Sequence, residues 1–167
     1  KLLPGGVGGG PWEGGRIIGY NSVVDNGTHV LLYYDAFSVN GPVKNDIKRC
    51  TCLAISTDGG LTFTKPNLGL VSFNGSMDNN IVMPRNKTSW SSGTVFIDDN
   101  PAAPSTERYK LIALWNPHTH EQEDDSGTWT FASADGIDFH PLSRGPVYHG
   151  SDTQDVALFD ARLGKYV

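Results

Sequence analysis

The chain has 167 residues, enough for one domain with a sizeable core, and its 13 basic and 18 acidic side chains give a net charge of −5. This acidic balance leaves no basic stripe to neutralise phosphates, so we expect no nucleic-acid partner. No apolar run approaches the roughly 20 residues of a membrane helix, so we expect no membrane insertion. The sequence shows neither an initiator Met nor a signal-peptide segment, and we expect a mature or trimmed fragment.

The predicted elements are short strands. No window holds the apolar spacing of a helix over three turns, and 20 glycines and 10 prolines punctuate the chain. In chain order, strands are predicted at 16–20, 29–34, 50–56, 79–83, 93–98, 109–115, 128–133 and 154–159, with another beginning at 165. The sequence therefore predicts an all-β fold of antiparallel meanders, with α-helix in less than about a tenth of the residues.

An internal repeat indicates how these strands are grouped. The segment 55–63 parallels 132–139, and each contains a Ser-x-Asp-Gly turn before a Phe and a Pro. The two aspartates, Asp58 and Asp135, are 77 residues apart. That spacing exceeds the ~40–50 residues of a compact propeller blade, so we expect insertions at 40–48 and 116–127.

The repeated unit fits part of a four-stranded propeller blade. About nine strands at four per blade make about two and a half blades, fewer than a closed propeller needs. We therefore expect one partial β-propeller domain over 1–167, with blades at about 12–77 and 78–150 and the start of another at 151–167. Further polypeptide, or further copies of this chain, would supply the rest.

Two cysteines, Cys50 and Cys52, lie two residues apart on a predicted strand. They would share one face of that strand, too close along the backbone for an ordinary mutual disulfide. They are either free thiols or paired with a part of the protein outside this sequence.

Three Asn-x-Ser/Thr sequons lie in polar, turn-like stretches, at Asn26, Asn74 and Asn86. Surface positions of this kind tolerate a glycan. They favour a secreted, extracellular glycoprotein.

Seven strings along the chain carry a family resemblance. They are Trp12-Glu13, Ser56–Phe63, Lys65–Leu70, Phe73–Val82, Phe96–Lys110, Ser151–Ala157 and Gly164–Val167. In order and spacing they resemble the five-bladed propellers of the invertase, levansucrase and arabinanase type, glycoside hydrolases and their uncharacterised relatives. The string at Ser56–Phe63 also resembles the Asp-box of sialidases, with Phe63 in place of the usual Trp, so a sialidase-like propeller is a lesser alternative.

Glycoside hydrolysis typically needs two carboxyl groups across the scissile bond. Asp78 and Asp152 are the candidates, because each follows a repeat turn and is expected to open an inner strand. They are 74 residues apart, close to the repeat of 77, which predicts equivalent positions on neighbouring blades. Either aspartate could instead simply cap its strand.

Further residues around these aspartates are candidates for contacting a carbohydrate. They are Asn79, Asn80, Gln154, Asp155, Asp160 and Trp90. Asp160 matches a substrate-binding aspartate of the resembled enzymes only loosely, and it could equally shape a hairpin turn. Trp12 could also stack on a sugar, and Trp115 and Trp129 fit a packed core better.

A complete catalytic set is not visible. The nucleophile motif of the invertases is absent, and Glu13 could face the central funnel or only hold the first strand. His118, His120 and Glu123 have metal-ligand spacing, but they lie in an acidic insertion typical of a solvated loop. We therefore expect no metal and no cofactor.

Two hypotheses of different classes follow. One is a glycoside hydrolase-like propeller that acts on or binds glycans. The alternative is a non-catalytic, glycosylated structural or assembly module.

Overall fold

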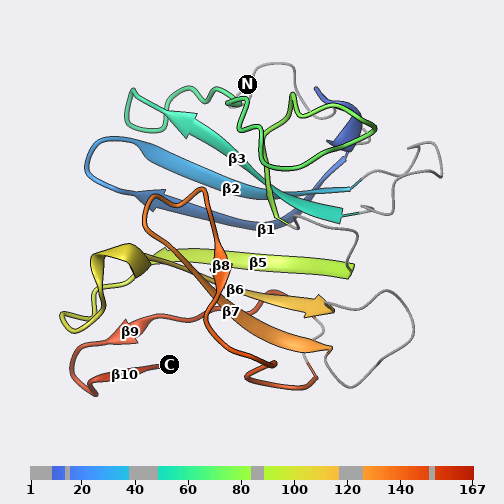
Figure 1. The fold of residues 1–167 in the computed structure, drawn as a ribbon. Helices are drawn as coiled ribbons and strands as arrows, with labels where there is room; N and C mark the ends of the chain where they lie inside the picture. Colours follow the sequence, from blue (N-terminus) through green and yellow to red (C-terminus); the bar gives the residue numbers. More distant parts are fainter. Residues whose placement is uncertain (1–8, 14–15, 38–48, 84–88, 117–125, 151–152) are drawn as a thin grey trace.

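The computed structural model describes residues 9–13, 16–37, 49–83, 89–116, 126–150 and 153–167. Two four-stranded antiparallel sheets lie one above the other, and a short hairpin lies on the far side of the second sheet (Figure 1). The first sheet has the order β1 (Arg16–Asp25), β2 (Val30–Phe37), β3 (Arg49–Ser56), β4 (Ile81–Met83). The second has the order β5 (Ser89–Ile97), β6 (Tyr109–Asn116), β7 (Gly127–Ser133), β8 (His140–Pro141), and the hairpin consists of β9 (Phe159–Asp160) and β10 (Lys165–Tyr166).

The all-β prediction is confirmed. The described residues form ten strands and no α-helix, with 3-10 turns η1 (Pro11–Glu13) and η2 (Ser105–Glu107). None of their helices is long and apolar enough to cross a membrane. Sequence analysis did not predict β8, because Pro141 lacks a backbone N–H and proline usually interrupts a strand. β8 lies at the edge of the sheet, where the missing donor costs no hydrogen bond to a neighbouring strand.

The strand predicted at 79–83 belongs to the first sheet. β4 pairs with β3 (Thr51 with Met83), whereas sequence analysis placed this strand at the start of the second unit. The first sheet therefore extends to Met83, and the second begins at β5.

The internal repeat is visible in the strand pairing. Val30 faces Ser56 in the first sheet as Tyr109 faces Ser133 in the second, directly beside the two Ser-x-Asp-Gly turns. An irregularity interrupts β1 and β2 between Ile18 and Ser22, and another interrupts β5 and β6 at the matching place. The two sheets are therefore copies of one unit.

The two copies stack through different faces. From the first sheet, Tyr33 and Leu53 enter the core between the sheets; from the second, Leu111 and Phe131 enter it. When the two sheets are aligned through their strand pairing, Phe131 corresponds to Ala54 of the first sheet. Ala54 belongs to a separate cluster, on the face of the first sheet that points away from the second. Contact between unlike faces makes this a head-to-tail arrangement, which repeats into rings or open stacks.

The hairpin continues this arrangement. Ser22 of β1 accepts a hydrogen bond from the Val95 amide (3.0 Å), and Thr94, in the matching position of β5, accepts one from Gln154 (2.9 Å). At both junctions a tyrosine hydroxyl is hydrogen-bonded to the turn of the preceding sheet. Asn26 donates to the hydroxyl of Tyr109 at 3.0 Å, and the hydroxyl of Tyr166 donates to Asp98 at 2.7 Å. The segment 154–166 thus sits on the second sheet much as β5 and β6 sit on the first.

The outer face of the first sheet has its own core. Phe63, Val71 and Phe73, from the connection between β3 and β4, cover a cluster that includes both cysteines. Cys50 and Cys52 are buried free thiols with sulfurs 3.7 Å apart, on one face of β3 as predicted. Burial raises the pKa of the Cys52 thiol, which disfavours its thiolate form.

Candidate functional site

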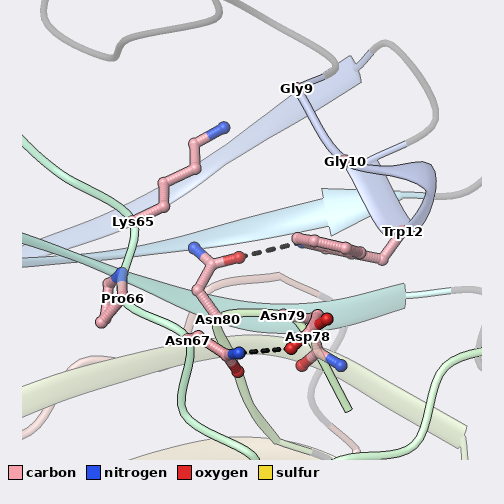
Figure 2. A pocket seen from close by; sticks show the side chains of 9 residues that line it. All are labelled: Gly9, Gly10, Trp12, Lys65, Pro66, Asn67, Asp78, Asn79 and Asn80. Carbon is pink, nitrogen blue, oxygen red and sulfur yellow. Dashed lines mark hydrogen bonds between the residues drawn. The ribbon is translucent and has the colours of Figure 1, made fainter. Parts of the chain in front are cut away.

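A hollow of about 270 Å³ lies where the N-terminal turn η1 meets the long connection between β3 and β4 (Figure 2). Indole, amide, carboxylate and ammonium groups come together there. Its lining residues are Gly9, Gly10, Trp12, Lys65, Pro66, Asn67, Asp78, Asn79 and Asn80.

A buried ion pair fixes the back of the hollow. Glu13 is fully buried and accepts from the Lys65 ammonium at 2.7 and 2.9 Å. It also accepts from the Tyr34 hydroxyl at 2.7 Å and from the Gly10 amide at 2.9 Å. Burial above all, with the nearby Cys52 and Glu13, raises the pKa of Tyr34, which keeps this hydroxyl a donor. Glu13 therefore anchors the N-terminal segment and is not free to act on a ligand.

Asn80 holds the indole of Trp12. The Asn80 amide nitrogen donates to the Tyr34 hydroxyl and to the Leu53 carbonyl, both at 2.7 Å. Its oxygen accepts from the Trp12 indole N–H at 3.0 Å, and the ring packs edge-on against Phe73. A Cβ on Gly10 would lie 2.5 Å from the indole, so this position needs glycine. The half-buried Trp12 ring is thus fixed at the rim.

An exposed polar pair forms the opposite rim. The amide nitrogen of Asn67 donates to one carboxylate oxygen of Asp78 (Figure 2). The backbone of Asp78 is held in turn by Ser76, whose hydroxyl accepts from the Asp78 amide at 3.0 Å. The hollow is therefore lined by both a fixed aromatic ring and an exposed carboxylate–amide pair.

Of the two predicted catalytic aspartates, the structure places one. Asp78 lines the hollow, but it precedes β4, the fourth strand of its sheet, rather than opening a first strand as expected. The cause is the extra chain between Thr64, which bridges to β3, and β4 itself. Asp152 lies outside the described residues, so the equivalence of the two aspartates stays a prediction.

The other predicted contact residues separate into buried supports and distant groups. Asn79 lines the hollow yet is buried, donating to the Val71 carbonyl at 2.7 Å. Gln154 and Asp155 bond Thr94 and Thr128 on the second sheet.

Two remaining candidates also lie away from the hollow. Asp160 accepts from the backbone and guanidinium of Arg162 in the turn between β9 and β10, the hairpin alternative noted from the sequence. Trp90 lies in β5 opposite Trp115, and its side chain is outside the described part of the chain.

The three sequons differ in accessibility. Asn74 is exposed at a tight turn between Phe73 and Ser76. The amide nitrogen of Asn26, the atom that would carry a glycan, instead donates to Tyr109 across the sheet interface. Asn86 lies outside the described residues.

Sequence analysis did not single out Lys65 or Asn67, although both lie in the Lys65–Leu70 string that carries the family resemblance. It left the role of Glu13 open. No local pattern reveals that Lys65 reaches Glu13, because 52 residues separate them. His118, His120 and Glu123 lie outside the described residues. Within the part of the chain that the structure describes, no group of three or more His, Cys, Asp or Glu side chains could hold a metal ion.

Comparisons with known proteins add little. No family model matches the chain, and no curated protein matches it. A solved structure of an N-acetylgalactosamine deacetylase from F. plautii, in complex with blood group B trisaccharide, is similar to it with a TM-score of 0.42 and 15% sequence identity. The likeness covers 79% of this chain and 31% of that one, and it is too weak to carry an argument.

Proposed function

We propose that the hollow beside Trp12 binds a glycan, and that the chain is part of an extracellular, carbohydrate-binding β-propeller. The observation that carries the proposal is that one hollow is lined by the fixed Trp12 ring and by the exposed Asp78–Asn67 pair. Aromatic faces pack against the C–H faces of sugars, and planar carboxylate and amide groups bond adjacent hydroxyls. The sequence resemblance to furanosidase-type glycoside hydrolases supports the same function.

Binding is better supported than hydrolysis. Among the residues that line the hollow, Asp78 carries the one carboxylate, and the nearby Glu13 is neutralised by Lys65. A hydrolase needs a second carboxyl group, at about 5–10 Å from the first. A glycoside hydrolase-like activity would therefore require a group beyond those described.

The propeller part of the proposal rests on the head-to-tail stacking. Two equivalent sheets and a hairpin continue in one direction through unlike faces, as blades do around an axis. The second candidate function, an assembly module, is favoured by the apolar outer face of the second sheet, where a hollow of about 480 Å³ remains.

Glycan binding is tested with an Asp78→Ala variant on an array of glycans, followed by titration of the best ligand. Asp78 is exposed, so the variant should fold normally. Loss of its hydrogen bonds should weaken binding by about 1–3 kcal/mol, and Trp12→Phe should weaken it less. The matched control is Asp99→Ala, at an exposed turn of the second sheet. Undiminished binding by Asp78→Ala would exclude this hollow as the site.

The extracellular proposal is tested by glycan occupancy. In protein secreted from eukaryotic cells, Asn74 should be glycosylated and Asn26 should be unmodified, because a sugar on the Asn26 nitrogen would have to fit at the interface where that nitrogen bonds Tyr109. Peptide mass analysis before and after deglycosylation measures both sites. An occupied Asn26 beside an empty Asn74 would contradict this assignment.

A further inference from the structure

We propose that the ligand of the Trp12 hollow is a saccharide without acidic groups, neutral or carrying a free amine, rather than a uronic or sialic acid. This inference rests on the proposed glycan binding and adds the class of sugar. Its basis is the supply of unused donors, acceptors and charge in the hollow.

The donors at the back of the hollow are largely engaged. The Trp12 indole N–H is directed to Asn80, and the Gly10 amide to Glu13. Lys65 directs its ammonium to both oxygens of Glu13 and lies 6.0 Å from the centre of the Tyr34 ring. An incoming carboxylate, which is acceptor-only when ionised, would meet no uncompensated positive charge, because Glu13 already neutralises Lys65.

The exposed rim keeps two unused acceptors, alongside the second N–H of the Asn67 amide. Asn67 must turn its amide nitrogen toward Asp78, because a carboxylate cannot donate, and this leaves the Asn67 carbonyl oxygen facing away. That oxygen and the second carboxylate oxygen of Asp78 have no hydrogen-bond partner among the described residues. Hydroxyl and ammonium groups, which donate, complement such a rim.

Charge points to the same class of ligand. Among the lining residues Lys65 and Asp78 are the charged ones, and Lys65 is cancelled by the buried Glu13. Asp78 is paired with a neutral amide, so the hollow keeps one uncompensated negative charge. Two like charges a few ångströms apart at a protein surface repel by an energy equivalent to about a tenfold change in affinity.

The experiment compares three forms of one methyl hexoside: the parent sugar, the 2-amino sugar and the uronic acid, in both the glucose and the galactose series. Binding is measured by ligand-observed NMR titration at low salt. We expect the uronic acid to bind at least about tenfold more weakly than the parent, and the amino sugar to bind at least as well. The difference should shrink as salt is raised.

The Asp78→Asn variant makes the test specific to this rim. In this variant the affinity for the uronic acid should be within about threefold of the affinity for the parent sugar. Asp99→Asn should leave the difference between the two affinities unchanged. Circular dichroism and the unfolding midpoint check that both variants fold. A uronic acid bound as tightly as the parent would overturn this inference and leave glycan binding intact. Binding of no sugar in either series would overturn both.

Discussion

The first and second sheets are copies of one unit, but they differ in the chain that follows the Ser-x-Asp-Gly turn. In the first sheet, residues 65–80 lie between the bridge of Thr64 to β3 and the strand β4. In the second, only 142–147 lie between β8 and the bridge of Tyr148 to β7. The longer connection supplies Lys65, Asn67, Asp78 and Asn80 to the hollow. The candidate site is therefore built from the segment that the two copies do not share.

The same difference changes what each sheet exposes. Both faces of the first sheet are covered, one by the second sheet and one by the longer connection with Trp12. The second sheet has one face against the first, and its other face, which carries Phe96 and Ile112, is only partly covered by the segment 154–166, which leaves the hollow of about 480 Å³. Val147, which lines this hollow, is 56% exposed. The first sheet thus carries the candidate binding site, and the second sheet exposes apolar surface.

The two faces of the second sheet should differ most in their contribution to stability. Phe131 is fully buried between the sheets, so Phe131→Ala should lower the free energy of unfolding by about 3–5 kcal/mol. Phe96 is half-buried on the open face, and Phe96→Ala should cost about 1 kcal/mol. Urea unfolding of the 167-residue chain measures both. Equal losses would mean that the outer face is already covered in solution.

The buried ion pair of the first sheet should outweigh the exposed pair of the hairpin. Glu13→Gln leaves the mostly buried Lys65 without its counter-charge and should destabilise the chain by about 2–3 kcal/mol. Arg162→Gln removes an ion pair in which the arginine side chain is 89% exposed, and should change stability by less than about 0.5 kcal/mol. Comparable losses in the two variants would show that Glu13 is not buried in solution.

Sequence analysis recovered β1 to β7 because their apolar runs and glycine turns are local signals. The strand predicted at 154–159 was wrong, since 154–158 are irregular and β9 begins only at Phe159. It also found the repeat, whose 77-residue offset matches the pairing of Ser56 and Ser133. Reasoning from that repeat led it to look for the site at equivalent positions, and so it paired Asp78 with Asp152. The structure places Asp78 in the unshared connection, where equivalence between copies carries no information.

The contacts that build the site could not be predicted because they are long-range. Trp12 reaches Asn80 across 68 residues and Asn80 reaches Tyr34 across 46. Buried asparagines satisfied by such contacts look, in the sequence, like the solvated asparagines of any loop. Asn79 and Asn80 line the hollow and bond protein groups, and their predicted contact with a carbohydrate stays a prediction.

The two Ser-x-Asp-Gly turns can also be compared by how much each contributes to stability as the pH is lowered. Hydrogen bonds from Ser56 and then Thr62 lower the pKa of Asp58 to about 2, from an ordinary 3.8. Burial would raise the pKa of Asp135, but amide bonds from Asp138 and Ile137 outweigh it and the pKa is lowered. A depressed carboxyl pKa stabilises the fold above the unfolded-state pKa, and this contribution is lost as the pH falls toward the folded-state value.

The stability of the chain should therefore decline between about pH 4 and pH 2, and each turn should account for part of the decline. Asp58→Asn and Asp135→Asn should each lower the urea midpoint at pH 6, and the difference from the unmodified chain should narrow as the pH approaches 2. The effect of Asp58 should be small because its carboxylate is fully exposed to solvent. The matched control is Asp99→Asn, at an exposed turn outside the repeat motif. Its urea midpoint should change with pH as that of the unmodified chain does. If the stability of the Asp58 and Asp135 variants changes with pH as that of the unmodified chain does, these carboxylate hydrogen bonds do not stabilise the folded chain over the unfolded chain.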